Sequence, residues 1–248
     1  MSTPASVDHR ILEFGRQWRN KPVLREIYHD LYRRMAGELA QGRTLEIGSG
    51  AGGFKEFAPD VITTDILSAP WLDLVADAQA LPFAADSFGN IVMFDVLHHI
   101  EFPRRFFSEA LRVLAPGGRI VMMEPAITPL SWPFYRFLHA EPLDLNADPL
   151  HDGAPAQDRD PFAANQAIPT LLAGAHRTQF AAAFPQFKIA PPRWLSLFAY
   201  PLSGGFKPWS LIPYGLVKPL LKLEEALLPV LGRLMAFRLM TVIEKRRP

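Results

Sequence analysis

A run of small residues near position 50 is the stretch of this sequence best suited to holding a ligand. Gly48, Ser49, Gly50 and Gly53 follow the β-rich run 44–48 (TLEIG), which predicts a strand entering a glycine-rich turn. Glycine adopts backbone conformations that a side chain forbids and lets a ligand approach the main chain closely. A helix after the turn would offer its unpaired N–H groups to the same ligand. The turn alone is a weak signal, because three of its glycines also satisfy the dinucleotide-binding spacing.

An acid lies where it could contact the same ligand. Asp65 ends a second β-rich run, Val61–Asp65, so we expect its carboxylate at the carboxyl edge of a sheet, beside the turn. There it can accept hydrogen bonds from both hydroxyls of a ribose, and it would repel a phosphate at the 2′ position. These residues fit a nicotinamide cofactor or any other adenosine-bearing ligand.

The elements that must position these residues follow from the pattern of apolar residues. Short β-rich runs cover 44–48, 61–65, 90–96 and 118–123, and a segment with helical spacing, 104–114, precedes the last of them. Continuous apolar strands that alternate with helices are typical of a parallel sheet covered on both faces. The sequence therefore predicts an α/β fold with a doubly wound sheet.

Four further motifs decide between the ligands. They are VADAQALPF at 75–83, DSFGNIV at 86–92, DVLHHI at 95–100 and EALRVLAPGGR at 109–119. In this order and spacing, residues 43–125 resemble the class I S-adenosylmethionine-dependent methyltransferases. The resemblance implies a Rossmann-like, mostly parallel sheet of seven strands with the last strand antiparallel. It also implies S-adenosyl-L-methionine as cofactor and S-adenosyl-L-homocysteine as product.

The resemblance also implies the residues that bind the cofactor. Glu46 would lie under the methionine amino group, Asp65 would bind the ribose hydroxyls, and Asp77 would accept from the adenine amino group. The complete set is Glu46, Gly48, Ser49, Gly50, Asp65, Ile66, Asp77, Ala78, Asp95 and Leu97. One departure is that only about eleven residues, 53–63, separate the glycine turn from the end of the second strand. The first helix must be short, so neighbouring segments must complete the pocket.

Methyl transfer from a sulfonium demands little of protein side chains. The enzyme must align nucleophile, methyl carbon and sulfur, and exclude water. A general base is needed only for a hydroxyl or a protonated amine. By the resemblance His98 faces the transfer site, and His139 lies after the fifth strand, where substrate-binding segments occur. We therefore predict His98 and His139 as catalytic residues, and expect His99 to be a packed structural residue.

Metal chemistry has little support in the sequence. The chain has no cysteine, which excludes disulfides and thiolate metal sites. His139, Glu141, His151 and Asp152 lie close in sequence, but their spacing is not a recognised ligand pattern. We expect no metal.

Proline divides the chain into two halves. Seven of the 24 prolines fall in residues 1–124 and seventeen in 125–248, and proline is excluded from helix interiors and central strands. We expect a helical cap over residues 1–42, with helix from 9 to 41, and a cofactor-binding core over 43–125. A substrate-side insertion would cover 126–186. The last part, 187–248, would complete the sheet with strands at 187–200 and 237–244.

The 216–236 segment is almost entirely apolar, with Pro219 and Pro229 as expected breaks. It predicts either packing against this domain or a second copy of the chain, or peripheral contact with an anionic membrane through residues 200–236. The start of the chain, Met1–Asp8, lacks the pattern of a signal peptide, and a net charge of +1 gives no indication of nucleic acid. We expect a cytoplasmic protein.

The predicted function is methyl transfer to a small molecule, such as a sugar, a quinone or a lipid-linked precursor. A nicotinamide-dependent oxidoreductase is the second reading, but no tyrosine–lysine pair follows the fourth strand. A non-catalytic binding module is the third, and the intact acids Glu46, Asp65 and Asp77 argue against it. The acceptor atom cannot be read from the sequence.

Overall fold

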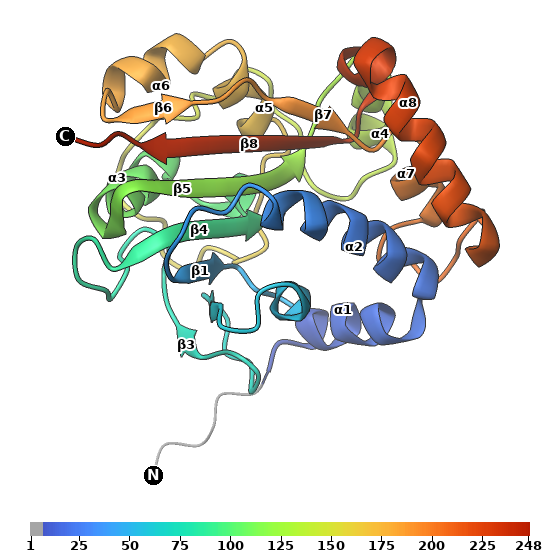
Figure 1. The fold of residues 1–248 in the computed structure, drawn as a ribbon, viewed down its shortest axis with the longest axis horizontal. Coiled ribbons are helices and arrows are strands. Elements are labelled where there is room, and N and C mark those ends of the chain that lie inside the picture. The colour runs from blue at the N-terminus through green and yellow to red at the C-terminus, as the bar shows by residue number, and fades with distance from the viewer. Residues whose placement is uncertain (1–6) are drawn as a thin grey trace.

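The computed structural model describes residues 7–248, which form one mixed sheet with helices on both faces (Figure 1). The sheet order is β3-β2-β1-β4-β5-β8-β6, and β7 also pairs with β8. The strands are β1 Thr44–Ile47, β2 Ile62–Asp65, β3 Leu74–Val75, β4 Phe88–Phe94, β5 Leu114–Pro125, β6 Phe187–Ile189, β7 Arg193–Leu195 and β8 Arg238–Lys245. The pairs from β3 through β5 are parallel, and β8 is antiparallel to β5, β6 and β7.

Helices cover the two faces of this sheet. The α-helices are α1 His9–Asn20, α2 Pro22–Ala36, α3 Pro103–Val113, α4 Ser131–Phe137, α5 Ile168–Ala173, α6 Arg177–Ala183, α7 Ala199–Ser203 and α8 Val217–Met235. The 3₁₀ turns are η1 Gly53–Glu56, η2 Leu97–His99 and η3 Tyr214–Leu216. Successive residues of β4 point to opposite faces: Ile91 and Met93 pack with α3, α5 and α6, whereas Val92 packs with α2, α7 and α8. The predicted doubly wound α/β fold is confirmed.

The C-terminal part of the sheet differs from the prediction. Eight strands form where seven were expected, because Pro191 and Pro192 divide the predicted strand 187–200 into β6 and β7. Both short strands pair with β8. Proline lacks the N–H that a continuous ladder needs, which explains the division. The rest of that predicted strand, from residue 199, is helix α7.

Two helix predictions were wrong in their boundaries. The expected single helix over 9–41 is divided at Lys21 into α1 and α2, because Pro22 begins the second helix and removes an N–H from the first position. The segment 216–236 is one continuous helix: Pro219 lies in its first turn, and Pro229 is accommodated inside. The predicted short helix after the glycine turn is the 3₁₀ turn η1.

Within residues 7–248, no helix is both long and apolar enough to span a bilayer. The signal-peptide prediction rests on Met1–Asp8, of which residues 1–6 lie outside the described part of the chain.

Candidate active site

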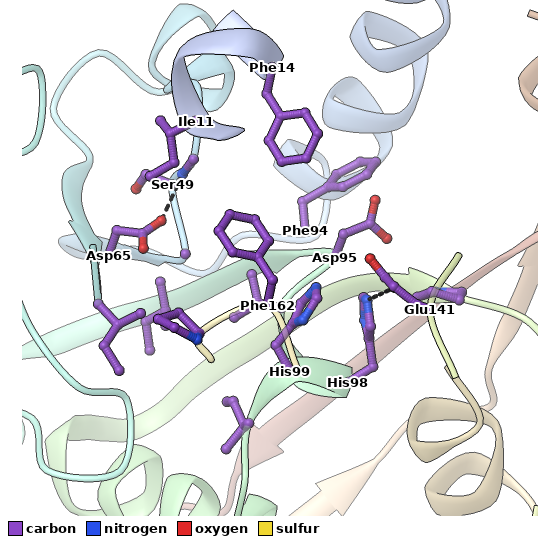
Figure 2. Close-up of a pocket in the computed structure, with 18 of the residues that line it drawn as sticks. Ile11, Phe14, Ser49, Asp65, Phe94, Asp95, His98, His99, Glu141 and Phe162 are labelled. Carbon is purple, nitrogen blue, oxygen red and sulfur yellow. Dashed lines mark hydrogen bonds and ion pairs between the residues drawn. The ribbon is translucent and has the colours of Figure 1, made fainter. Parts of the chain in front are cut away.

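A large cavity opens at the carboxyl ends of β1, β2 and β4, beneath α1 (Figure 2). Its volume is about 1130 Å³, enough for a nucleoside cofactor and a second molecule. Eleven of the twelve predicted site residues line it. The exception is Leu97, whose side chain is buried in the core below the cavity and whose backbone N–H donates to Glu124. The walls are rich in aromatic rings: Phe14, Trp18, Tyr28, Tyr32, Phe94, Phe134, Tyr135, Phe162, Tyr200, Phe206 and Trp209.

The first position of the glycine turn requires glycine. Gly48 has a φ of +67°, in the left-handed region, and a Cβ there would lie 2.3 Å from Cγ2 of Val96. The Ser49 amide donates to the Thr64 carbonyl over 2.9 Å, which ties the turn to β2. The turn therefore brings its main chain against the cavity at a place where no side chain fits.

Asp65 is held by the backbone on both of its carboxylate oxygens. The amide of Gly50 donates to Oδ2 over 3.0 Å, and that of Leu67 donates to Oδ1 over 3.0 Å. Burial raises the pKa of Asp65, and these N–H bonds oppose the rise. The carboxylate is thus fixed in orientation and retains lone pairs that face the cavity.

Glu46, beside the glycine turn, has an unusual environment for a carboxylic acid. It is buried, and its Oε2 has no hydrogen-bond partner among the described residues. The same is true of the neighbouring Ser49 hydroxyl. Burial raises the pKa of Glu46 to about 8. A buried polar atom without a partner is costly, so Glu46 is suited to pairing with a polar ligand group.

Asp77 and Ala78 border the far side of this end. Asp77 is exposed, and its Oδ1 accepts from the Gln79 amide over 2.8 Å. Ala78 is buried, and Ile66, half exposed, lies at the end of β2 nearby. The residues that the resemblance assigns to the adenosine therefore line the same cavity as the glycine turn.

At the other end of the cavity, His98 lies between Glu124 and Glu141. Figure 2 shows its contact with Glu141. Nδ1 of His98 is 2.7 Å from Glu124 Oε2, and its Nε2 is 3.4 Å from Glu141 Oε2. Burial disfavours charge on the ring, but the two carboxylates outweigh burial and raise the pKa of His98 to about 10. Glu124 also accepts from the amides of Val96 and Leu97. At neutral pH His98 is an imidazolium with both nitrogens engaged.

Asp95 faces the same end of the cavity and pairs with a buried arginine. Its carboxylate contacts Nη1 of Arg238, whose guanidinium lies 4.1 Å from the ring centre of Tyr200. Asp95 has a φ of +58°, which is strained for a residue other than glycine. The main-chain turn at the end of β4 thus presents this carboxylate to the cavity, and Arg238 neutralises it.

The remaining histidines divide between the cavity and the surface. His139 lines the cavity, and burial lowers its pKa, so its ring is neutral at pH 7. Burial also lowers the pKa of His99, to about 4, and its Nδ1 has no partner within residues 7–248. His151 is exposed and packs edge-on against Phe102, outside the cavity lining.

Sequence reasoning missed three residues of this end. Glu124 follows the predicted strand 118–123 directly, and it was recognisable as an acid at the carboxyl edge of the sheet. Tyr28 and Arg238 gave no such signal, because each reads as part of an ordinary helix or strand. Glu141 was noted only in the rejected metal pattern. In the structure, ligand atoms of His98, His99 and Glu141 lie within 4.8 Å of one another.

The comparison with protein families matches residues 45–122 to the family described as "Methyltransferase domain". The demethylmenaquinone methyltransferase of Renibacterium salmoninarum is 30% identical over 102 residues, which are 36% of this chain and 43% of that protein. The ubiquinone/menaquinone biosynthesis C-methyltransferase of Paracoccus denitrificans is 33% identical over 92 residues, 36% of this chain and 34% of that protein. The chain thus spans less than half the length of these relatives.

Solved structures extend the similarity of fold over nearly the whole chain. A SAM-dependent methyltransferase from Thermotoga maritima aligns with 96% of this chain and 99% of its own, with a TM-score of 0.55 and 16% identity. Another from Archaeoglobus fulgidus aligns with 90% and 94%, with a TM-score of 0.50 and 16% identity. The family match identifies a methyltransferase domain over residues 45–122, and the solved structures share the fold of nearly the whole chain.

Proposed function

We propose that this protein transfers a methyl group from S-adenosylmethionine to a small, largely apolar acceptor. One observation carries the proposal: a single cavity joins the glycine turn, Glu46 and Asp65 at one end to an aromatic chamber at the other. The volume of about 1130 Å³ accommodates both reactants side by side.

The residues at the first end fit this cofactor. The unpartnered Oε2 of Glu46 suits the ammonium of a methionine chain, and the fixed carboxylate of Asp65 suits the two ribose hydroxyls. Asp77 and Ala78 would hold the adenine. When bound, the cofactor supplies a methyl group that is already activated on a sulfonium.

The chain would contribute alignment and exclusion of water rather than covalent chemistry. His98 is charged, with Nδ1 hydrogen bonded to Glu124 and Nε2 ion-paired with Glu141, so we propose that it positions Glu141 rather than acting as a base. His139 is neutral and lines the cavity, so it is the better candidate to accept a proton from an acceptor that must lose one.

We propose a planar, quinone-type ring as the acceptor. Aromatic side chains line most of the chamber, and flat rings stack favourably on such walls. One of the two relatives is named a demethylmenaquinone methyltransferase and the other a ubiquinone/menaquinone biosynthesis C-methyltransferase, which supports an acceptor of this class. We also propose that residues 43–125 bind the cofactor and that the flanking segments 1–42, 126–186 and 187–248 select the acceptor.

Titration with S-adenosylhomocysteine in a calorimeter tests the proposal, followed by transfer of labelled methyl to a reduced naphthoquinone. We expect micromolar binding and label in the quinone fraction. Asp65→Ala should weaken binding more than tenfold. Asp60→Ala, an exposed acid outside the cavity, should leave binding unchanged. No binding by the wild-type protein would leave a nicotinamide enzyme or a non-catalytic module as the better reading.

We also propose that the protein is cytoplasmic. Its residues 200–236 would contact a membrane. A second copy of the chain is the alternative occupant of that surface.

A further inference from the structure

Helix α8 has two apolar faces, and only one of them packs on the protein. Val217, Glu224 and Gly232 face inward, and the Glu224 carboxylate accepts from the amide of Ala199 at the start of α7. Leu216, Leu223, Val230 and Leu234 instead lie exposed, at 56, 52, 79 and 46% of their surface. They are seven, seven and four residues apart, so they form one stripe along the outside of the helix.

The stripe continues onto α4. The amide of Leu130, just before α4, donates to the carbonyl of Leu234 over 3.0 Å, so α4 lies against the end of α8 (Figure 1). Trp132, Phe137 and Leu138 of this region are exposed at 37, 69 and 67%. A surface of this extent is unusual on a protein that contacts only water.

A second extension lies at the beginning of α8. Trp209, Leu211 and Tyr214 precede the helix and are exposed at 44, 71 and 56%. The stripe on α8, the α4 residues and these three residues are together called the apolar platform.

The charges around the apolar platform have one predominant sign. Segments 130–138 and 202–234 carry five exposed cations, Arg136, Lys207, Lys218, Lys222 and Arg233, of which Lys218 lies 3.6 Å from Glu26. The single exposed acid of these segments, Glu225, is paired with Arg34. A second copy of the chain would bring the same cations to the interface, and they would repel one another. An anionic lipid surface would attract them.

The apolar platform also reaches the mouth of the active-site cavity. Leu138 and Trp209 belong to the platform, and both line the cavity as well. An apolar molecule that leaves a bilayer beneath the platform would therefore meet the cavity without crossing water.

We propose that the apolar platform docks on an anionic bilayer and that the acceptor enters the cavity directly from the lipid, past Leu138 and Trp209. This rests on the proposed methyl transfer to an apolar acceptor, and it adds the source of that acceptor and the route of entry.

Flotation with vesicles tests the docking. The wild-type protein should float with vesicles of phosphatidylcholine and phosphatidylglycerol and stay in solution with phosphatidylcholine alone. The double variant Leu223→Ser/Val230→Ser should lose at least fivefold in the floated fraction, as should the triple variant Lys218→Glu/Lys222→Glu/Arg233→Glu. Leu74→Ser/Val75→Ser changes two exposed apolar residues at the opposite edge of the sheet and should float like the wild type.

Quenching by brominated lipid tests the position of the cavity mouth. Tryptophan emission of the bound protein should be quenched, and Trp132→Phe/Trp209→Phe should remove most of that quenching while leaving flotation within twofold. Quenching that persists in this variant would show that the mouth faces away from the bilayer and would overturn the entry route.

Wild-type protein that stays in solution with anionic vesicles would overturn the docking. So would dimerisation, seen by sedimentation, that Leu223→Ser/Val230→Ser abolishes in the absence of lipid binding. Titration with S-adenosylhomocysteine without lipid keeps the two proposals apart. A protein that binds this product but not vesicles refutes only the docking, and one that binds vesicles but not the product refutes only the methyl transfer.

Discussion

The two ends of the cavity are built in different ways. The end with the glycine turn, where we propose that the cofactor binds, is called the cofactor end. It draws on a short stretch of chain between Glu46 and Ala78, and its geometry is set largely by backbone hydrogen bonds. The opposite end, called the acceptor end, collects Tyr28, Asp95, Glu141 and Arg238 from elements far apart in sequence.

The two ends also differ in how their polar groups are satisfied. At the cofactor end, Glu46 and Ser49 each have a buried oxygen without a partner in the described chain. At the acceptor end His98 is ion-paired with two glutamates and Asp95 with Arg238, but Nδ1 of His99, Nε of Arg238 and Oε1 of Gln166 are also buried without a partner in the described chain. Both ends can therefore accept a polar ligand group. The acceptor end differs in that its carboxylates are already paired with cations and its walls are aromatic.

Gly48→Ala should produce the largest effect, a loss of binding at the cofactor end that leaves the acceptor end unchanged. The new Cβ would overlap Val96 and force alanine into the left-handed region, which costs about 1–2 kcal/mol before the overlap is counted. We expect affinity for S-adenosylhomocysteine to fall more than a hundredfold, measured by calorimetry on protein shown to be folded by circular dichroism. Gly215→Ala has open space around its Cβ and should bind normally. Normal binding by Gly48→Ala would contradict the assignment of the turn.

Glu124→Gln should lower the free energy of unfolding, because His98 at the acceptor end loses a carboxylate partner. The raised pKa of His98, about 10 against 6.5 in the unfolded chain, gives stability that is complete below pH 6.5 and disappears as pH rises through 10. We expect the variant to lose about 2 kcal/mol of unfolding free energy at pH 6, and less at pH 10. Urea denaturation across that range measures the difference. An equal loss at both pH values would show that His98 is not charged in the folded protein.

Glu46→Gln tests whether the unpartnered acid responds to the cofactor. With a pKa of about 8, Glu46 is mostly protonated at pH 7, and a ligand ammonium favours its ionised form. Binding of S-adenosylhomocysteine should then release close to one proton, and affinity should rise between pH 6 and 8. Calorimetry in buffers of different ionisation enthalpy counts the proton. The variant should release none and bind about tenfold more weakly; the same proton release from it would assign the titration to another group.

Lys21→Met should have the smallest effect, a local loosening of residues 204–209, most of which line the cavity. Nζ of Lys21 donates to the carbonyls of Gly205, Lys207 and Trp209 over 2.6–2.8 Å. We expect a loss of about 1 kcal/mol, because the burial of the ammonium offsets part of the three bonds. Amide exchange in residues 204–209 should quicken, with product affinity within threefold of the wild type. Lys188→Met, at an exposed lysine, is the control. Unchanged exchange in Lys21→Met would show that Lys21 does not hold residues 204–209 in place.

The sequence placed the residues of the proposed cofactor end more fully than those of the proposed acceptor end, for a physical reason. A strand, a glycine turn and an acid at the next strand end are local patterns, and parallel strands bring their carboxyl ends together wherever they lie. Eleven of the predicted residues consequently line one cavity. Leu97 did not, because the 3₁₀ turn η2 directs its side chain into the core.

The acceptor end depended on tertiary contacts that no local pattern contains. Arg238 looks like an ordinary strand residue, and only the antiparallel pairing of β8 with β5 brings it beside Asp95. Which face of the 216–236 segment is exposed was equally hidden. Its apolar composition predicted either burial or a membrane contact, and the structure shows one face packed and the other exposed.

The division between the two ends is tested most directly by one calorimetric comparison of two variants. We predict that Asp65→Ala weakens the binding of S-adenosylhomocysteine more than tenfold, whereas Glu141→Gln, at the acceptor end, changes it less than threefold. Equal losses in the two variants, or no loss in Asp65→Ala, would contradict the assignment of the cofactor to the glycine-turn end of the cavity.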